Sequence, residues 1–293
     1  MRTLFLLTFA FFLLFSCQKE ANDNGNGNNN QPADTSALGK FVSATKISDA
    51  GVKAAVDSLI IDSRNHGWWG LCTAIYPLVG GTPDACKYNL KDPQDVDGAY
   101  RITWHGNINF DNQGALSNGG WGDTHIIPSS ALSLSSNHIS IYSVTDLFDT
   151  ASVDLGAEDA NGTLQLSIYA GITSGIPQGY YLSGSLQAYY IANPGLAGYF
   201  IGTRTSPIVS PSAGSVYKNG IAIQDSTLAD ADPEALPNLS LDILNKNAFS
   251  IHTRRSNRKC AFATVGYGIS SDMAVIMYND IQKFQIKLGR AIY

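Results

Sequence analysis

Carboxylates are the side chains in this sequence most able to perform catalysis, and their spacing does not favour it. Glycoside hydrolases place two carboxyl groups on either side of the scissile bond, about 5 Å apart in retaining enzymes. The sequence contains three Glu residues, Glu20, Glu158 and Glu234, so two glutamates cannot lie along one strand. The nearest acidic group, residues 154–159, has the pattern of a strand that leads into a turn. We therefore expect no enzymatic activity, and a glycoside hydrolase acting through Asp154 and Glu158 is the least favoured alternative.

The sequence also lacks the motifs of nucleophilic catalysis and of phosphate binding. The five His residues are scattered, and no Gly-x-Ser-x-Gly elbow accompanies them. The glycines around Trp121 are followed by neither a Lys nor a helix, which a phosphate-binding loop requires. The formal net charge of −5 comes without a basic stripe, which argues against nucleic acid as a partner. These observations favour a binding module over an enzyme.

One acidic segment has the residue types of a calcium site. Asp225, Asp230, Asp232 and Glu234 lie close together in a stretch that also contains Pro233. Carboxylate oxygens on an irregular loop are the ligands that Ca²⁺ prefers. The sequence therefore offers Asp230, Asp232 and Glu234 as candidate Ca²⁺ ligands, while a solvated acidic loop explains the same residues. No other cofactor is expected.

The best candidate for ligand binding is the loop at residues 117–123, Ser-Asn-Gly-Gly-Trp-Gly-Asp. An indole between glycines in a polar loop has few core partners, so Trp121 can be exposed to a sugar ring. Asn118 and Asp123 can then hydrogen-bond the sugar hydroxyls. The alternative is a Trp121 that folds back as a lid on the core. The other three tryptophans lie on apolar segments and are expected in the core: Trp68, Trp69 and Trp104.

Four basic residues cluster near the C-terminus: Arg254, Arg255, Arg258 and Lys259. We interpret this local patch as a solvated loop rather than as an anion site.

Beyond Cys17, the sequence has three cysteines, Cys72, Cys86 and Cys260. One disulfide with one free thiol and three buried free thiols are equally compatible with this number. No Cys-x-x-Cys or His–Cys spacing indicates zinc.

The N-terminus has the pattern of an exported lipoprotein. Arg2 precedes a short apolar run, and Leu14-Phe15-Ser16-Cys17 resembles a bacterial lipobox. We expect cleavage after residue 16, lipidation of Cys17 and, because the next residues resemble a Bacteroidetes surface-export signal, display on the outer membrane. The acyl chains would then make the membrane a partner. Residues 17–40 are predicted to be a flexible Asn/Gly-rich linker, and residues 41–293 to be one domain.

The remaining sequence predicts many short strands and two helices. Asp49 can cap a helix that ends near Gly67, and Ser270 can cap another that ends at Gly289. Residues 71–76 and 99–110 are predicted strands, and Asn219-Gly220 predicts a type I′ hairpin. Turn signals recur without intervening helices, which indicates an all-β sandwich of antiparallel sheets.

Several stretches taken in order resemble one family. They are residues 74–82, 87–93, 198–204, 217–220 and 260–269 with the final helix. The chain resembles laminin-G-like domains of phage virions and Bacteroidetes surface proteins, within the concanavalin-A-like lectin/glucanase superfamily. This resemblance implies a jelly roll and no established ligand, although laminin-G-like domains often bind calcium at a rim loop. We expect a non-catalytic recognition module that binds carbohydrate, with a protein-contact module of a surface or phage-like appendage as the alternative.

Overall fold

The computed structural model describes residues 36–147, 152–173, 176–184, 195–205, 214–223, 235–248, 252 and 254–293. These residues belong to one compact unit, Asp34–Tyr293. The predicted lipidation site Cys17, the signal peptide and the proposed Ca²⁺ ligands Asp230, Asp232 and Glu234 lie outside the described residues. No described helix is long and apolar enough to cross a membrane.

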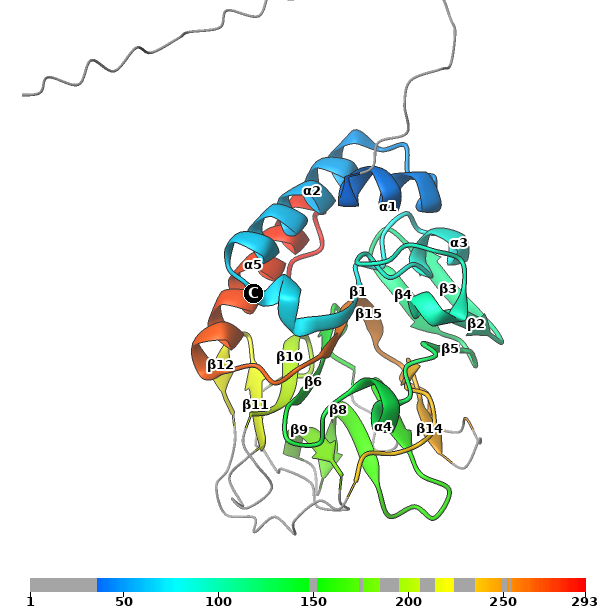
Figure 1. Ribbon diagram of the computed structural model, residues 1–293, viewed down its shortest axis with the longest axis vertical. Helices are drawn as coiled ribbons and strands as arrows, with labels where there is room; N and C mark the ends of the chain where they lie inside the picture. Colours follow the sequence, from blue (N-terminus) through cyan, green and yellow to red (C-terminus); the bar gives the residue numbers. More distant parts are fainter. Residues whose placement is uncertain are drawn as a thin grey trace, which may run out of the picture. The chain divides into compact units, whose positions relative to one another are not determined.

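Two β-sheets form most of the unit (Figure 1). The first sheet has the strand order β12-β11-β10-β6-β15-β4-β3, and β1 also pairs with β15. Its strands are β1 (Cys72–Tyr76), β3 (Ile108–Asp111), β4 (Gly114–Ser117), β6 (Asn137–Ser143), β10 (Gly198–Arg204), β11 (Gly214–Lys218), β12 (Ile221–Ala222) and β15 (Lys259–Gly266). Every pairing in this sheet is antiparallel.

The second sheet has the order β2-β5-β13-β7-β8-β9, with β14 also paired to β7. Its strands are β2 (Thr103–His105), β5 (Trp121–Asp123), β7 (Leu155–Glu158), β8 (Gln165–Thr173), β9 (Ile176–Ser183), β13 (Asp242–Ile243) and β14 (Lys246–Ala248). Only β14 runs parallel to its neighbour. The predicted mostly β architecture of two sheets is confirmed, with mixed rather than purely antiparallel pairing in the second sheet.

Three of the helices, α1 (Ala37–Thr45), α2 (Ala50–Asn65) and α5 (Ser271–Lys287), cover the outer face of the first sheet. The other described helices are α3 (Pro83–Cys86) and α4 (Pro128–Ala131), with 3₁₀ turns η1 (Trp68–Leu71) and η2 (Asp97–Ala99). One core cluster lies between the sheets, with Ile141 and Ile243 as examples from each. A second cluster joins the other face of the first sheet to α1, α2 and α5 through residues such as Phe262 and Phe284. The unit therefore has three layers: helices, first sheet and second sheet (Figure 1).

The two predicted helices are confirmed with their caps. The Asp49 carboxylate accepts a hydrogen bond from the Val52 N–H (2.8 Å), and the Ser270 hydroxyl accepts one from Met273 (3.3 Å). Gly67 and Gly289 follow the helix ends with φ of 85° and 66°, a conformation that glycine adopts without strain. Local capping chemistry therefore sets where both helices begin and end.

Helix α1 differs from the sequence-based expectation. Its first residues, Ala37 to Lys40, fall in the stretch that was assigned to the flexible linker. The Ser36 hydroxyl accepts a hydrogen bond from the Gly39 N–H (3.0 Å), and Phe41 is buried under the helices. A short helix is stable here because tertiary packing of this aromatic ring compensates for its length.

The single strand predicted at residues 99–110 is wrong. The chain forms η2, then β2 in the second sheet, and then β3 in the first. Gly106 separates the two strands with φ of 68°. Alternation of polar and apolar residues continues through this break, so the pattern alone did not reveal the change of sheet. In contrast, Asn219 (φ 51°) and Gly220 (φ 77°) form the predicted hairpin turn between β11 and β12.

All three cysteines of the described unit are buried free thiols. Burial raises the pKa of Cys72, Cys86 and Cys260 to about 12. These thiols are therefore unreactive parts of the core.

Candidate binding site on the second sheet

The outer face of the second sheet is polar. Thr103, Asp123 and Asp242 are directly opposite one another across β2, β5 and β13. Their neighbours on each strand, such as Ile243, point into the core between the sheets. Because side chains alternate along a strand, the first three residues share the opposite face. Helices α1, α2 and α5 pack against the first sheet and not against this face.

Three stacked aromatic rings stand on this face. The Trp121 indole stacks on His105 at a centroid distance of 5.1 Å and on His252 at 4.2 Å, with interplanar angles of 18° and 13°. The two imidazoles make no ring contact with each other among the described residues, so Trp121 is the middle ring. We call His105, Trp121 and His252 the aromatic column. Trp121 is half-buried and starts strand β5, so it is neither a lid on the core nor an indole with two free faces.

A buried carboxylate holds one end of the column. The His252 Nδ1 lies 2.5 Å from the Asp242 Oδ2, and the Asn245 amide donates to the same oxygen (2.8 Å). Asp242 is fully buried, and this burial raises its pKa to about 6 against the opposing effect of its two partners. Its Oδ1 has no hydrogen-bond partner within the described part of the chain. Asp242 therefore fixes the imidazole orientation through the His252 Nδ1.

The chain segment that carries His252 is anchored by a buried ion pair. Arg258 donates to Asp154 through Nε (3.0 Å) and Nη2 (2.7 Å), and both residues are almost completely buried. The Ser256 hydroxyl donates to the same carboxylate (2.5 Å), and the Ser256 N–H donates to the Leu244 carbonyl (2.8 Å). The bidentate geometry gives this pair both strength and direction. It fixes the segment after residue 252 against β7 and the β13–β14 connection.

This pair corrects two expectations. Arg258 does not belong to a solvated basic loop, because it is buried against Asp154. Lys259 is also paired, since its Nζ lies 2.5 Å from Asp111 Oδ2. Of the four predicted basic residues, Arg254 and Arg255 are exposed, and the Arg255 guanidinium lies 5.4 Å from the Trp121 ring centroid.

The acidic residues considered for hydrolysis are used in structural ion pairs. Asp154 binds Arg258, and Glu158 binds the buried Lys246, which also donates to Gln165 (3.2 Å). Neither carboxylate faces solvent, because Asp154 is 2% and Glu158 8% exposed. Their arrangement offers no open site for an acid and a nucleophile.

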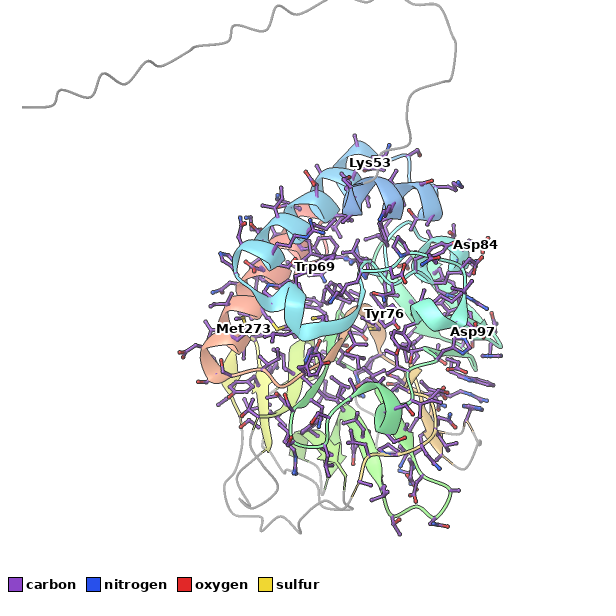
Figure 2. All side chains as sticks on the ribbon, viewed as in Figure 1. Lys53, Trp69, Tyr76, Asp84, Asp97 and Met273 are labelled. Atoms are coloured by element: carbon purple, nitrogen blue, oxygen red, sulfur yellow. The ribbon has the colours of Figure 1, made fainter. Side chains whose placement is uncertain are left out.

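A rim of hydrogen-bonding groups borders the column. Asp123 Oδ1 accepts the His125 N–H (2.8 Å), and the His125 Nε2 lies 2.7 Å from the Thr103 hydroxyl. On the far side of His125, Asp97 pairs with Arg101 (2.8 Å). Figure 2 shows Asp97 on the side of β2 and β5, away from Trp69 and the helices. This rim supplies both donors and acceptors beside the column.

The structure brings together two of the three predicted binding residues. Trp121 and Asp123 lie on the same outer face because they are two positions apart on β5, with Gly122 between them. Asn118 is exposed in the preceding turn, where its N–H donates to the Asn107 carbonyl (2.9 Å), and its side chain makes no contact with the column among the described residues. No group of three metal-binding side chains is present in the described residues.

Sequence reasoning missed His105, Asp242, His252 and Arg255 as members of the site. They come from three parts of the chain that are far apart in the sequence: β2, β13 and the stretch that carries His252 and Arg255. The exposed position of His105 in a polar/apolar alternation was the one local signal that could have suggested its outward orientation.

A cleft with a volume of about 780 Å³ lies elsewhere. It is bordered by the α1–α2 connection, α3 and the end of α5, with Lys46, Asp84, Lys87 and Lys287 among its lining residues. None of the predicted binding residues reaches it. Its Lys87 ammonium is already paired with Asp84 and Asp95.

Comparison with known proteins gives a likeness in fold. A mutant sialidase from Trypanosoma rangeli that displays trans-sialidase activity matches with a TM-score of 0.50 and 13% identity, over 79% of this chain and 39% of that one. Domain 4 of AbnA, a GH43 extracellular arabinanase from Geobacillus stearothermophilus solved with arabinotriose, matches with a TM-score of 0.47 and 14% identity, over 71% of this chain and 98% of that domain. The CBM40 of a Ruminococcus gnavus IT-sialidase matches with a TM-score of 0.35 and 12% identity, over 50% and 84%.

No family model matches the chain, and no curated protein matches it. The likeness to the sialidase, at 13% identity, concerns the fold alone.

Proposed function

We propose that this chain is a non-catalytic, surface-anchored module that binds carbohydrate on the outer face of the second sheet. The observation that carries the proposal is the aromatic column of His105, Trp121 and His252 on a polar sheet face against which α1, α2 and α5 do not pack. Aromatic rings bind the apolar faces of sugars, and neighbouring polar groups bind the hydroxyls. The finer assignment to a laminin-G-like jelly roll rests on the sequence resemblance and is part of the proposal.

The geometry of the aromatic column changes which ring a sugar can stack on. Both faces of the Trp121 indole carry an imidazole, so a sugar ring cannot lie flat on it as it would on an isolated indole. The exposed His105 ring closes one end of the column, and its outer face is the stacking surface. Asp123 and Thr103 stand beside it as hydrogen-bonding groups. Trp121 then acts by holding the imidazoles in place.

The absence of catalysis is supported by how the carboxylates are used. Asp154 and Glu158 hold buried cations. Asp242 is enclosed beneath His252, so a substrate cannot approach it from the open face without moving the imidazole. The lipid anchor at Cys17 and display on the outer membrane enter the proposal from the sequence pattern alone.

A glycan array probed with the full mature chain tests the proposal. We expect binding to a defined set of glycans and a loss of about tenfold or more in affinity for Trp121→Ala, which corresponds to about 1.4 kcal/mol. Trp69→Ala is the matched control, because Trp69 is also a half-buried indole beneath a cation, Arg64 at 4.8 Å, on the helical side. An array without hits, or equal losses in both variants, would refute the proposal, and binding to an appendage protein instead would favour the protein-contact alternative.

A further inference from the structure

We infer that the ligand of this site is an acidic glycan, a sugar chain that carries carboxylate or sulfate groups, and that Arg255 binds the anionic group. The inference rests on the proposed function, because it names the ligand class of the same face. Its basis is an exposed guanidinium fixed beside the aromatic column.

Arg255 presents an exposed guanidinium beside the aromatic column. Among the described residues, no carboxylate forms an ion pair with Arg254 or Arg255, and both side chains are exposed. The Arg255 guanidinium lies over the Trp121 ring at 5.4 Å. The exposed Arg255 guanidinium presents a planar N–H fork, which suits a two-point contact with a carboxylate or sulfate.

The backbone that carries the two arginines is held in place. The Arg254 carbonyl accepts the Val153 N–H (2.9 Å), and Arg255 forms an isolated parallel bridge with Val153. The following Ser256 and Arg258 both bind the buried Asp154. An exposed loop whose only role is solvation does not need this anchoring. Fixing the backbone lowers the entropic cost of binding a ligand.

The local charges favour an anion. Arg254 and Arg255 are exposed cations beside the column, and the imidazoles of His105 and His252 add hydrogen-bond donors. Of the three nearby carboxylates, Asp242 is enclosed by His252 and Asn245, Asp123 faces His125, and Asp97 is paired with Arg101. The chain as a whole has a formal net charge of −5. A positive edge beside the column is thus a local exception to the charge of the protein, and it would steer an acidic chain to the site.

Titration of the strongest array hit with variants tests the inference. We compare wild type, Arg255→Ala and Arg255→Lys, with Arg64→Ala as the matched control, since Arg64 is the exposed arginine over Trp69. Each hit is also tested after chemical neutralisation, by reduction of its carboxyl groups or by desulfation, which separates the two anion types.

We expect the strongest hits to be acidic, and Arg255→Ala to weaken binding by about tenfold or more. Arg255→Lys should recover part of the loss, because it keeps the charge and loses the planar fork. The affinity should fall between 50 and 500 mM salt, because salt screens exposed charges over about 10 Å at 0.1 M. Unchanged melting of the variants shows that they fold.

Three results would overturn the inference: hits that are neutral, affinity unaffected by neutralising the glycan, or Arg255→Ala indistinguishable from Arg64→Ala. Neutral hits that depend on Trp121 would leave the proposed carbohydrate function standing and remove only its acidic specificity. An array without hits would remove both.

Discussion

The two outer faces of the sandwich differ in how their polar groups are used. On the first sheet, β6 and β15 carry Ser140, His138 and Thr264 beneath the helical layer, and all three are fully buried. On the second sheet, β5 and β13 carry Asp123 and Asp242 on a face without such a layer. Both faces are built from antiparallel strands with similar alternation, so the difference lies in what covers them.

The covered face closes its polar groups into a chain. Tyr199 donates to Ser140 (3.0 Å), the hydroxyls of Ser140 and Thr264 are 2.5 Å apart, and Thr264 lies 2.9 Å from His138 Nε2. His138 Nδ1 then donates to the Tyr267 carbonyl (2.5 Å), which fixes the tautomer with the proton on Nδ1. Every member has a partner, as the low dielectric of the interior demands.

The open face leaves groups without partners. Asp242 Oδ1 and Asn245 Oδ1 are buried and have no donor among the described residues. The guanidinium of Arg255 and the outer ring face of His105 meet solvent. The comparison teaches that polar residues on a strand indicate a binding face only where no second layer completes their hydrogen bonds.

The largest effect concerns the ion pair that anchors the open face. Arg258→Ala should destabilise the protein by about 3–5 kcal/mol, because it leaves the Asp154 carboxylate buried without its cation. Urea unfolding measures this loss. The neighbouring Lys259→Ala, which removes the more exposed pair with Asp111, should cost less than about 1 kcal/mol. Equal losses in the two variants would show that the open face does not depend on this anchor.

The covered face should respond to acid through His138. Burial lowers the pKa of His138 to about 4 from the ordinary 6.5. Between these values the unfolded chain binds a proton that the folded protein does not, so stability falls as the pH drops from 6.5 to 4. The loss should reach about 3 kcal/mol below pH 4, and His138→Gln should remove this part of the pH dependence in urea unfolding at several pH values. If the free energy of unfolding changed with pH in the same way in the wild type and in His138→Gln, the lowered pKa of His138 would be contradicted.

The open face should contribute the opposite slope through Asp242. Its pKa is raised from 3.8 to about 6, mainly by burial. Between these values the folded protein keeps a proton that the unfolded chain has released, so this residue lowers stability as the pH rises from 3.8 to 6. The effect is at most about 3 kcal/mol. In the same unfolding series, the free energy of unfolding of Asp242→Asn should change with pH by a more positive slope than that of the wild type between pH 3.8 and 6. A more negative slope in the variant would refute the raised pKa of Asp242.

Local features of the fold could be predicted from the sequence. Asp49 and Ser270 cap helices through contacts three residues away, and Asn219-Gly220 forms its turn from two adjacent residues. Such features depend on neighbours in the chain. The break at Gly106 was missed because alternation persists across it.

The site could be predicted only in part, because it depends on pairing between distant segments. Trp121 and Asp123 stood out by their polar, glycine-rich context. The chain reverses direction between β13 and β14 at Leu244, where φ is 65°, and this conformation has no sequence signal for a leucine. The basic cluster also contains residues with two different environments, because Arg258 is buried and Arg255 is exposed. The burial of Arg258 depends on its pairing with Asp154, which lies more than a hundred residues away in the sequence.

The central claim, that carbohydrate binds the open face and not the helical side, can be tested through the tryptophans. The chain has four, so its indole N–H groups give four NMR signals, assigned by Trp→Phe variants. Trp121 lies in the aromatic column, whereas Trp68 and Trp69 lie beside the helices, as Figure 2 shows for Trp69. On titration with the strongest array hit, the account predicts a shift of the Trp121 signal and unchanged signals for Trp68 and Trp69. A shift at Trp69 with a constant Trp121 signal would contradict it.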